Sequence, residues 1–389
     1  MFLLAAYPIL ETYKFFDTPF SYATLLGTVL FFITITLDAK LINCPKTYLL
    51  FWVYAAIQLY FVAGISGWSD YFPGGISLVI FSLSMLGFVA SFRLKTFYYF
   101  LTRIWGVAVI LFVFQLFVFY LTGQKISVFL PLASETTYCN FSYAELVLHQ
   151  QQLSNSMIQR FCSIFCEPSY FAQYSLILLV IELFWSKNRY VVFTMYSLLI
   201  ILVIFLIQSG VGLLGLGIIG VMKLFDLVFV TKQKKYYLLL AVVVPLIVIG
   251  IISYLESNSG VYVASRTSEV TTIDGSKDSS VRIYYGWFIM ESFSPKQKLF
   301  GTSRNYIHNL VDEGFINGAQ TLVGTMGWIA AILLLIFYIR NVSGKGHIPI
   351  VFGMLLLYVM LIESIYLTGF MLLCTVIILG IKRQSNTSI

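Results

Sequence analysis

The chain has 389 residues, of which 59% are hydrophobic and only 11% are charged, and its mean hydropathy is +0.89. Because a soluble globular domain carries about 25% charged residues, this composition excludes an ordinary soluble protein and predicts one integral membrane domain over residues 1–389. The net charge of +7 does not indicate a nucleic-acid partner, since most Lys and Arg residues lie in short connections beside apolar runs, where they set orientation.

A membrane-spanning helix needs roughly 20 apolar residues. The runs are continuously apolar and show no sustained alternation, which predicts helices rather than a β-barrel. With residues 1–16 as the remnant of a short first helix, we expect an all-α bundle of about 11–12 transmembrane helices. The predicted runs are 20–37, 47–66, 75–92, 97–121, 169–185, 190–208, 210–230, 236–254, 319–339, 348–363 and 365–381.

The basic residues predict which side of the membrane each connection faces. Lys and Arg gather at every second crossing, and only Asp38 opposes them there. Such connections are cytoplasmic under the positive-inside rule. The segments 122–168 and 255–318 are then two larger outer loops. The basic connections are 38–46, 93–96, 186–189, 231–235, 340–347 and the tail from 382.

The first outer loop ends in Arg160 and in Glu167-Pro168-Ser169, directly before an apolar run. Proline suits the first position of a helix, and an acid before it suits the helix dipole, so structure alone accounts for this triplet. The functional alternative is that Glu167 is a carboxylate at the outer mouth of the bundle that accepts a proton from a sugar hydroxyl.

The loop 255–318 carries Arg266, Arg282, Arg304 and His308. Its six Lys and Arg residues face seven acids, so it is not a basic patch. Individual guanidinium groups match phosphate oxygens well, although each could also be a solvated loop charge. A histidine beside water can act as a general base near neutral pH, or simply bond to nearby backbone.

Two other patterns bear on the site. Apolar residues from Ser280 to about Phe293 have helical spacing, which predicts an amphipathic helix at the membrane surface. The chain has no phosphate-binding glycine loop, dinucleotide turn or metal-ligand helix pattern, so we expect neither a metal nor a cofactor.

The order of these pieces resembles the bacterial O-antigen polymerase and O-antigen ligase superfamily, the Wzy/WaaL-like glycosyltransferases. One departure concerns Gln208-Ser209-Gly210-Val211-Gly212, where the family often has a basic residue; Arg266 or Arg304 would have to replace that phosphate contact. The matching pieces are Arg160 through Ser169, Arg282-Ile283-Tyr284-Tyr285-Gly286-Trp287, Leu299-Phe300-Gly301, His308-Asn309 and Gly324 to Gly327.

The resemblance implies an inverting, metal-independent glycosyltransferase at the outer face of the bacterial plasma membrane. It would join undecaprenyl-diphosphate-linked oligosaccharide repeat units into capsule or O-antigen polysaccharide. Arg160 and Arg282 would neutralise the leaving diphosphate, and His308 or Glu167 would accept the hydroxyl proton. The family also implies partnership with membrane lipid, a flippase and a chain-length regulator. An O-antigen ligase acting on lipid A-core is the close alternative, and a lipid-linked oligosaccharide flippase is the alternative of another class.

Overall fold

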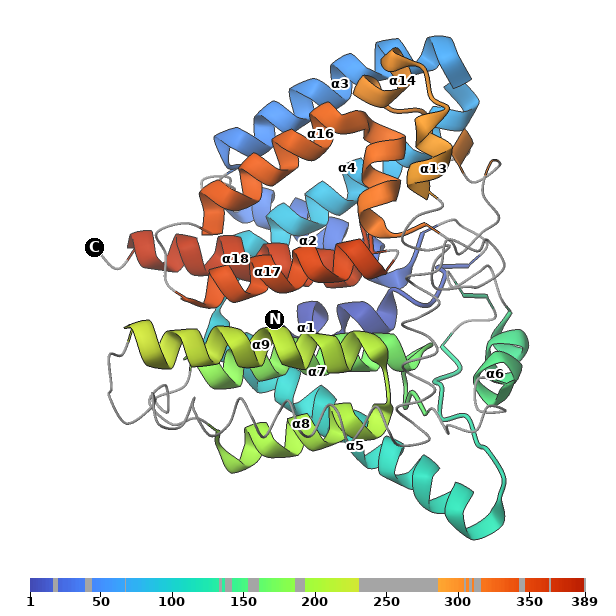
Figure 1. Ribbon diagram of the computed structural model, residues 1–389, viewed down its shortest axis with the longest axis vertical. Coiled ribbons are helices and arrows are strands. Elements are labelled where there is room, and N and C mark those ends of the chain that lie inside the picture. Colours follow the sequence, from blue (N-terminus) through green and yellow to red (C-terminus); the bar gives the residue numbers. More distant parts are fainter. Residues whose placement is uncertain are drawn as a thin grey trace.

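The structure is a computed structural model, and within the part of the chain that it describes there are helices and isolated β-bridges but no β-strand. This confirms the predicted all-α helical bundle (Figure 1). The described residues are 1–16, 20–38, 44–66, 68–132, 135–136, 142–152, 161–185, 193–230, 286–303, 306–307, 310, 316–342, 347–363 and 365–387.

The helices correspond closely to the apolar runs. Each predicted run except 236–254, which lies outside the described residues, contains a helix, and α1 is the short first helix. The helices are α1 (Phe2–Leu10), α2 (Tyr22–Asp38), α3 (Lys46–Ser66), α4 (Trp68–Ser91), α5 (Leu94–Thr122), α6 (Tyr143–Gln152), α7 (Pro168–Trp185), α8 (Met195–Ile207), α9 (Gly210–Phe225), the π-helical turn η2 (Asp226–Val230), α13 (Gly286–Glu291), α14 (Pro295–Phe300), α16 (Gly318–Val342), α17 (His347–Ile362) and α18 (Gly369–Thr387).

Several helices are suited to a membrane. Five of those described are long and apolar enough to cross one, and three shorter ones are also apolar. The chain is therefore a polytopic membrane protein. The five candidate spans are Gly74–Ser91, Leu94–Thr122, Pro168–Trp185, Gly210–Val228 and Gly318–Val342, and the shorter apolar helices are Tyr22–Leu37, Met195–Ile207 and His347–Ile362.

Helix α7 lies at the centre of the bundle, and all its residues except Tyr170 and Trp185 are buried. It packs against α5, α8, α9, α17 and α18, its Tyr174 hydroxyl donates to the Ala5 oxygen of α1 at 2.9 Å, and Figure 1 shows α7 and α9 side by side. Two glycines of α9 allow this approach, because a Cβ at Gly212 would lie 2.9 Å from Ala172 and one at Gly215 would lie 2.4 Å from Leu176. Small residues at a helix interface are typical of packing within membranes.

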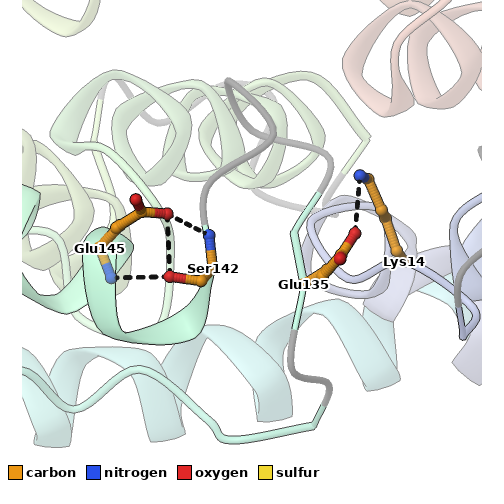
Figure 2. Close-up of polar contacts among 4 residues, drawn as sticks. All are labelled: Lys14, Glu135, Ser142 and Glu145. Atoms are coloured by element: carbon orange, nitrogen blue, oxygen red, sulfur yellow. Dashed lines mark hydrogen bonds and ion pairs between the residues drawn. The ribbon is translucent and has the colours of Figure 1, made fainter.

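One end of the bundle holds α6, the end of α1, the start of α7 and the α17–α18 turn; we call it the α6 end (Figure 1). There the segment after α1 meets the predicted first outer loop. The Lys14 ammonium lies 3.0 Å from a Glu135 oxygen, while Ser142 and Glu145 exchange hydrogen bonds at the start of α6 (Figure 2). Helix α6 is a structured element within a segment that we expected to be a loop.

The predicted run 319–339 is helical and long enough to span a membrane, but the helix is interrupted within it. Helix α16 is broken at Gly327, whose backbone has φ 78° and ψ 171°, a region that essentially only glycine enters. The orange helix in Figure 1 changes direction within its length. The part before the break packs with α13 and α14, and the long part after it runs beside α3 and α17.

Candidate active site

The break in α16 is where two of the sequence pieces meet. The last turn of α14 lies against it, so that a Cβ at Gly327 would be 2.0 Å from the Leu299 carbonyl oxygen and one at Gly301 would be 2.4 Å from the Thr325 oxygen. Gly301 also has a backbone open essentially only to glycine, with φ 79° and ψ −169°. The pieces Leu299-Phe300-Gly301 and Gly324 to Gly327 therefore form one contact of backbone against backbone, which we call the α16 break.

Breaking a helix frees carbonyl groups that must find donors when they are buried. The oxygens of residues 324, 325 and 326 are all satisfied. The first accepts from Thr302, through its backbone nitrogen at 2.8 Å and its hydroxyl at 3.0 Å; the second accepts from the Gln58 amide at 2.7 Å; and the third accepts from the Tyr54 hydroxyl at 2.6 Å. Two of these donors come from α3, far away in the sequence.

Helix α13 brings the Gly286-Trp287 piece to the same place. A Cβ at Gly286 would lie 2.6 Å from the Gln320 amide oxygen, so α13 approaches α16 closely. The indole of Trp287 stacks on that of Trp328, with ring centroids 5.5 Å apart. On the predicted amphipathic helix, Phe288 is 71% exposed. The C-terminal pieces that the structure describes, Gly286-Trp287, Leu299-Phe300-Gly301 and Gly324 to Gly327, thus share one neighbourhood.

Of the predicted site residues, only Glu167 lies within the described part of the chain. The described neighbours of two others are firmly held: Ser303 is 2% exposed and its hydroxyl accepts from the Tyr306 nitrogen, and Ile307 is 5% exposed in a small apolar cluster with Met290, Phe293, Ile316 and Val323. The predicted residues that lie outside the described part are Arg160, Arg266, Arg282, Arg304 and His308.

Glu167 precedes α7, and Pro168 is the first residue of that helix, as predicted. The Glu167 carboxylate is half-buried and accepts a hydrogen bond from the Ser169 hydroxyl at 2.9 Å. An acid placed here complements the positive end of the α7 dipole. Its position at the α6 end, next to a buried bundle, is compatible with both the structural and the functional interpretations.

Sequence reasoning missed two acids that accompany Glu167. The segments that carry Glu11 and Glu167 meet where the Thr12 hydroxyl lies 3.6 Å from the Cys166 sulfur, and both acids, with Glu363, contribute to the electrostatic surroundings of Tyr170, one turn after Glu167 on α7. We call these three acids the carboxylate group. The available signal was that each acid terminates an apolar run on the side of the membrane predicted to be outside. Spacing in the sequence could not show that they converge.

Glu11 joins α1 to α18. Its carboxylate accepts a hydrogen bond from the Gly369 nitrogen at 2.6 Å, at the first turn of α18, where backbone donors lack partners within the helix. Burial raises the pKa of Glu11 to about 7, and the bond from Gly369 opposes that rise. A carboxyl group with this pKa changes charge near neutral pH.

The carboxylate group and the α16 break are connected through the α17–α18 turn. The Gly318 nitrogen donates to the Glu363 carbonyl oxygen at 2.8 Å, and the Asn317 side chain donates to the Leu361 oxygen at 2.9 Å. The start of α16 is thereby fixed to the turn that also carries Glu363. The pieces around α16 are consequently fixed to the α17–α18 turn by hydrogen bonds, and Glu167 is related to that turn through the shared electrostatic surroundings of Tyr170.

Cys166 lies beside this group but does not suit a nucleophile. Burial raises the pKa of its thiol to about 12, so the thiol stays protonated at neutral pH. Its sulfur is 3.6 Å from the Thr12 hydroxyl. Among the residues that the structure describes, no three His, Cys, Asp or Glu side chains are placed to hold a metal ion together.

Comparison of the chain with protein-family models, with curated proteins and with solved structures gives no match.

Proposed function

We propose that this protein is a membrane glycosyltransferase that polymerises undecaprenyl-diphosphate-linked oligosaccharide repeat units. The carrying observation is that the described pieces of the resemblance, which are far apart in sequence, gather at one end of the bundle. Gly286-Trp287, Leu299-Phe300-Gly301 and Gly324 to Gly327 meet around α16, and the α17–α18 turn connects them to the carboxylate group that includes Glu167.

In the proposed reaction a sugar hydroxyl of the acceptor attacks the anomeric carbon of the lipid-linked donor. The bond from that carbon to the diphosphate oxygen breaks, and undecaprenyl diphosphate leaves. The configuration of the anomeric carbon is inverted. Negative charge grows on the leaving group. Fixed cationic groups aimed at such charge accelerate reactions strongly, which is the role we give to Arg160 and Arg282, with Arg266 and Arg304 as further phosphate contacts.

The acceptor hydroxyl must lose a proton as it attacks. His308 is our preferred base, because an imidazole titrates near neutral pH. Glu167 would orient the acceptor or take the proton instead. Its carboxylate, half-buried and fixed by Ser169, has the defined position that such a role requires.

The proposal places the reaction on the outer face of the bacterial plasma membrane. The α6 end holds the carboxylate group and the first turn of α7, and the positive-inside rule assigns the connections at that end to the outside. A lipid-linked donor could then enter the bundle from the bilayer, and polymer would leave to the exterior. A flippase and a chain-length regulator would work beside it.

The test is the surface polysaccharide of a strain that lacks the protein, complemented with wild type or with Arg282→Ala, His308→Ala or Glu167→Gln. We expect the deletion strain to accumulate single lipid-linked repeats, wild type to restore a ladder, and the Arg282 and His308 variants to fail although they reach the membrane. Removing one charge-stabilising group typically costs about 100- to 1,000-fold in rate.

Glu135→Gln is the matched control for Glu167→Gln, because Glu135 is an exposed carboxylate on the same end of the bundle; it should support a normal ladder. A normal ladder from both Arg282→Ala and His308→Ala would refute the site. A deletion strain with unchanged glycans would refute the glycosyltransferase. Long polymer that stays on the lipid carrier in the deletion strain would instead identify a ligase.

A further inference from the structure

Two polar side chains of α3 form hydrogen bonds with segments outside α3. Tyr54 and Gln58 are four residues apart, so they lie on one face of the helix. Gln58 is completely buried and Tyr54 is 7% exposed. A polar group inside a membrane bundle is costly and needs partners, and both side chains find theirs on α14 and α16.

Gln58 connects two segments with one amide group. Its nitrogen donates to the Phe300 carbonyl oxygen at 2.6 Å and to the Thr325 oxygen at 2.7 Å, so its two hydrogens are used on different segments. Phe300 ends α14, and Thr325 lies at the α16 break. A side chain without two such donors could not hold these two carbonyl groups together.

Tyr54 repeats the arrangement one turn earlier. Its hydroxyl oxygen lies 2.6 Å from the Met326 carbonyl oxygen and 3.3 Å from the Leu299 oxygen. Figure 1 shows α3 running beside α14 and the long part of α16. The same face of one helix thus fixes the end of α14 and the α16 break relative to each other.

The chain held in this way leads directly to the predicted chemistry. Gly301, Thr302 and Ser303 follow the clamped turn, all three are buried, and Arg304 is the next residue. We propose that Tyr54 and Gln58 are positioning residues, which hold the 299–303 segment and thereby set where Arg304 and His308 act. This inference rests on the proposed function for its consequence in catalysis, but the clamp itself can be tested without it.

The first measurement reports the clamp alone. The five cysteines are replaced by serine, and a single cysteine is introduced as Ser303→Cys. Position 303 is only 2% exposed, and the rate at which this cysteine reacts with a maleimide is measured in detergent. Gln58→Leu or Tyr54→Phe should speed the modification. For Gln58→Leu we expect about ten-fold, because each hydrogen bond lost shifts local opening by roughly two- to ten-fold. Ser292→Cys, at an exposed position, should react at one rate in every background.

Tyr48→Phe is the matched control. Tyr48 is also a buried tyrosine of α3, but its hydroxyl pairs with Ser82 of α4 at 2.7 Å and not with the 299–326 region. Removing it should leave the reactivity of the cysteine at position 303 unchanged within about two-fold, since no bond to this segment is lost. Tyr54→Phe deletes the same single atom, so the two variants differ only in which partner is lost.

The second measurement is polymer formation by purified protein from an undecaprenyl-diphosphate-linked repeat unit. We expect Gln58→Leu to lower kcat at least about ten-fold, with a smaller change in KM, because a misplacement of about 1 Å costs up to about 100-fold in rate. Tyr54→Phe should do the same more weakly and serves if Gln58→Leu does not fold. Tyr48→Phe should keep wild-type kcat.

Three results would overturn the inference. The cysteine at position 303 could stay protected in both Gln58→Leu and Tyr54→Phe, or Tyr48→Phe could lose as much protection as they do. The third is a raised reactivity in Gln58→Leu and Tyr54→Phe with unchanged kcat. If wild type makes no polymer while the deletion strain has normal glycans, the proposed function fails and the labelling alone decides the clamp. The two failures are therefore distinguishable.

Discussion

The α16 break and the carboxylate group satisfy buried polar atoms in opposite ways. At the break, neutral donors from Tyr54, Gln58 and Thr302 meet backbone carbonyl groups, and two glycines let the backbones touch. In the carboxylate group, three acids share the surroundings of Tyr170, and Glu11 accepts one backbone hydrogen bond.

This difference predicts different vulnerabilities. The described contacts of the break include no carboxylate, imidazole or ammonium group, so its geometry should be insensitive to pH around neutrality and very sensitive to added volume. The carboxylate group should tolerate changes of shape better, because a side chain can move, but it should respond to pH.

The largest effect is expected for Gly327→Ala. The new Cβ would lie 2.0 Å from the Leu299 oxygen, and the backbone is one that alanine avoids. Strain of about 1–3 kcal/mol and overpacking of about 1–3 kcal/mol give a destabilisation of roughly 2–6 kcal/mol. The unfolding temperature in detergent and the amount of protein in the membrane measure this.

Gly123→Ala is the control for that prediction. Gly123 also has a positive φ, of 69°, but nothing lies within 4 Å of its Cβ position. It should cost only the backbone strain, about 1 kcal/mol. Equal losses for the two variants would show that conformation alone, and not the contact with Leu299, makes glycine necessary at the α16 break.

The break also shows where sequence reasoning stopped. The apolar runs predicted the helices because membrane burial depends on local composition, and Pro168 marked the start of α7. Residues 319–339 gave no local sign of a break, since glycine is common in membrane helices. The donors that stabilise the break are Tyr54 and Gln58. They contact Met326 and Thr325 in space but are more than 260 residues away from them in the sequence.

The candidate site was predictable in part for a similar reason. Glu167-Pro168-Ser169 carries a local signature, a helix start, and that was visible in the sequence. An acid at the end of an apolar run, as Glu11 and Glu363 both are, lies where burial in the membrane costs little, so it gives no local signal of a site. Their grouping depends on how α1, α7 and α17 pack, and packing is not encoded in the spacing within any one helix.

The second prediction concerns the pH response of the carboxylate group. The pKa of Glu11 is raised by burial from 4.5 to about 7, so the unfolded chain loses this proton first. Stability from this residue is complete below about 4.5, falls as pH rises toward 7, and then levels off. Glu11→Gln should remove this slope, which is at most about 3 kcal/mol and is reduced by partial exposure. Unfolding temperatures from pH 4.5 to pH 8 measure it.

Glu145→Gln is the control of opposite sign. Hydrogen bonds from Ser142 lower the pKa of the exposed Glu145 carboxyl, so its contribution is present above its ordinary pKa and is lost as pH falls (Figure 2). If Glu11→Gln leaves the slope between pH 4.5 and pH 7 unchanged, the contrast between a pH-sensitive carboxylate group and a pH-insensitive break is wrong.

The smallest effect is expected at the exposed edge of the same end, where Lys14 pairs with Glu135 at 3.0 Å (Figure 2). The Glu135 side chain is 48% exposed, so water screens the pair, and the backbone bond from the Lys14 nitrogen to the Glu135 oxygen survives substitution. A double-mutant cycle of Lys14→Met and Glu135→Gln should give a coupling of about 0.2–1 kcal/mol that shrinks in high salt. A coupling as large as the Glu11 effect, and unaffected by salt, would mean that this edge is shielded from water like the carboxylate group. We expect Glu11 and Glu135 to differ because Glu11 is more buried, although both lie at the α6 end. A large, salt-independent coupling would remove that difference, and the charges at this end would then respond together.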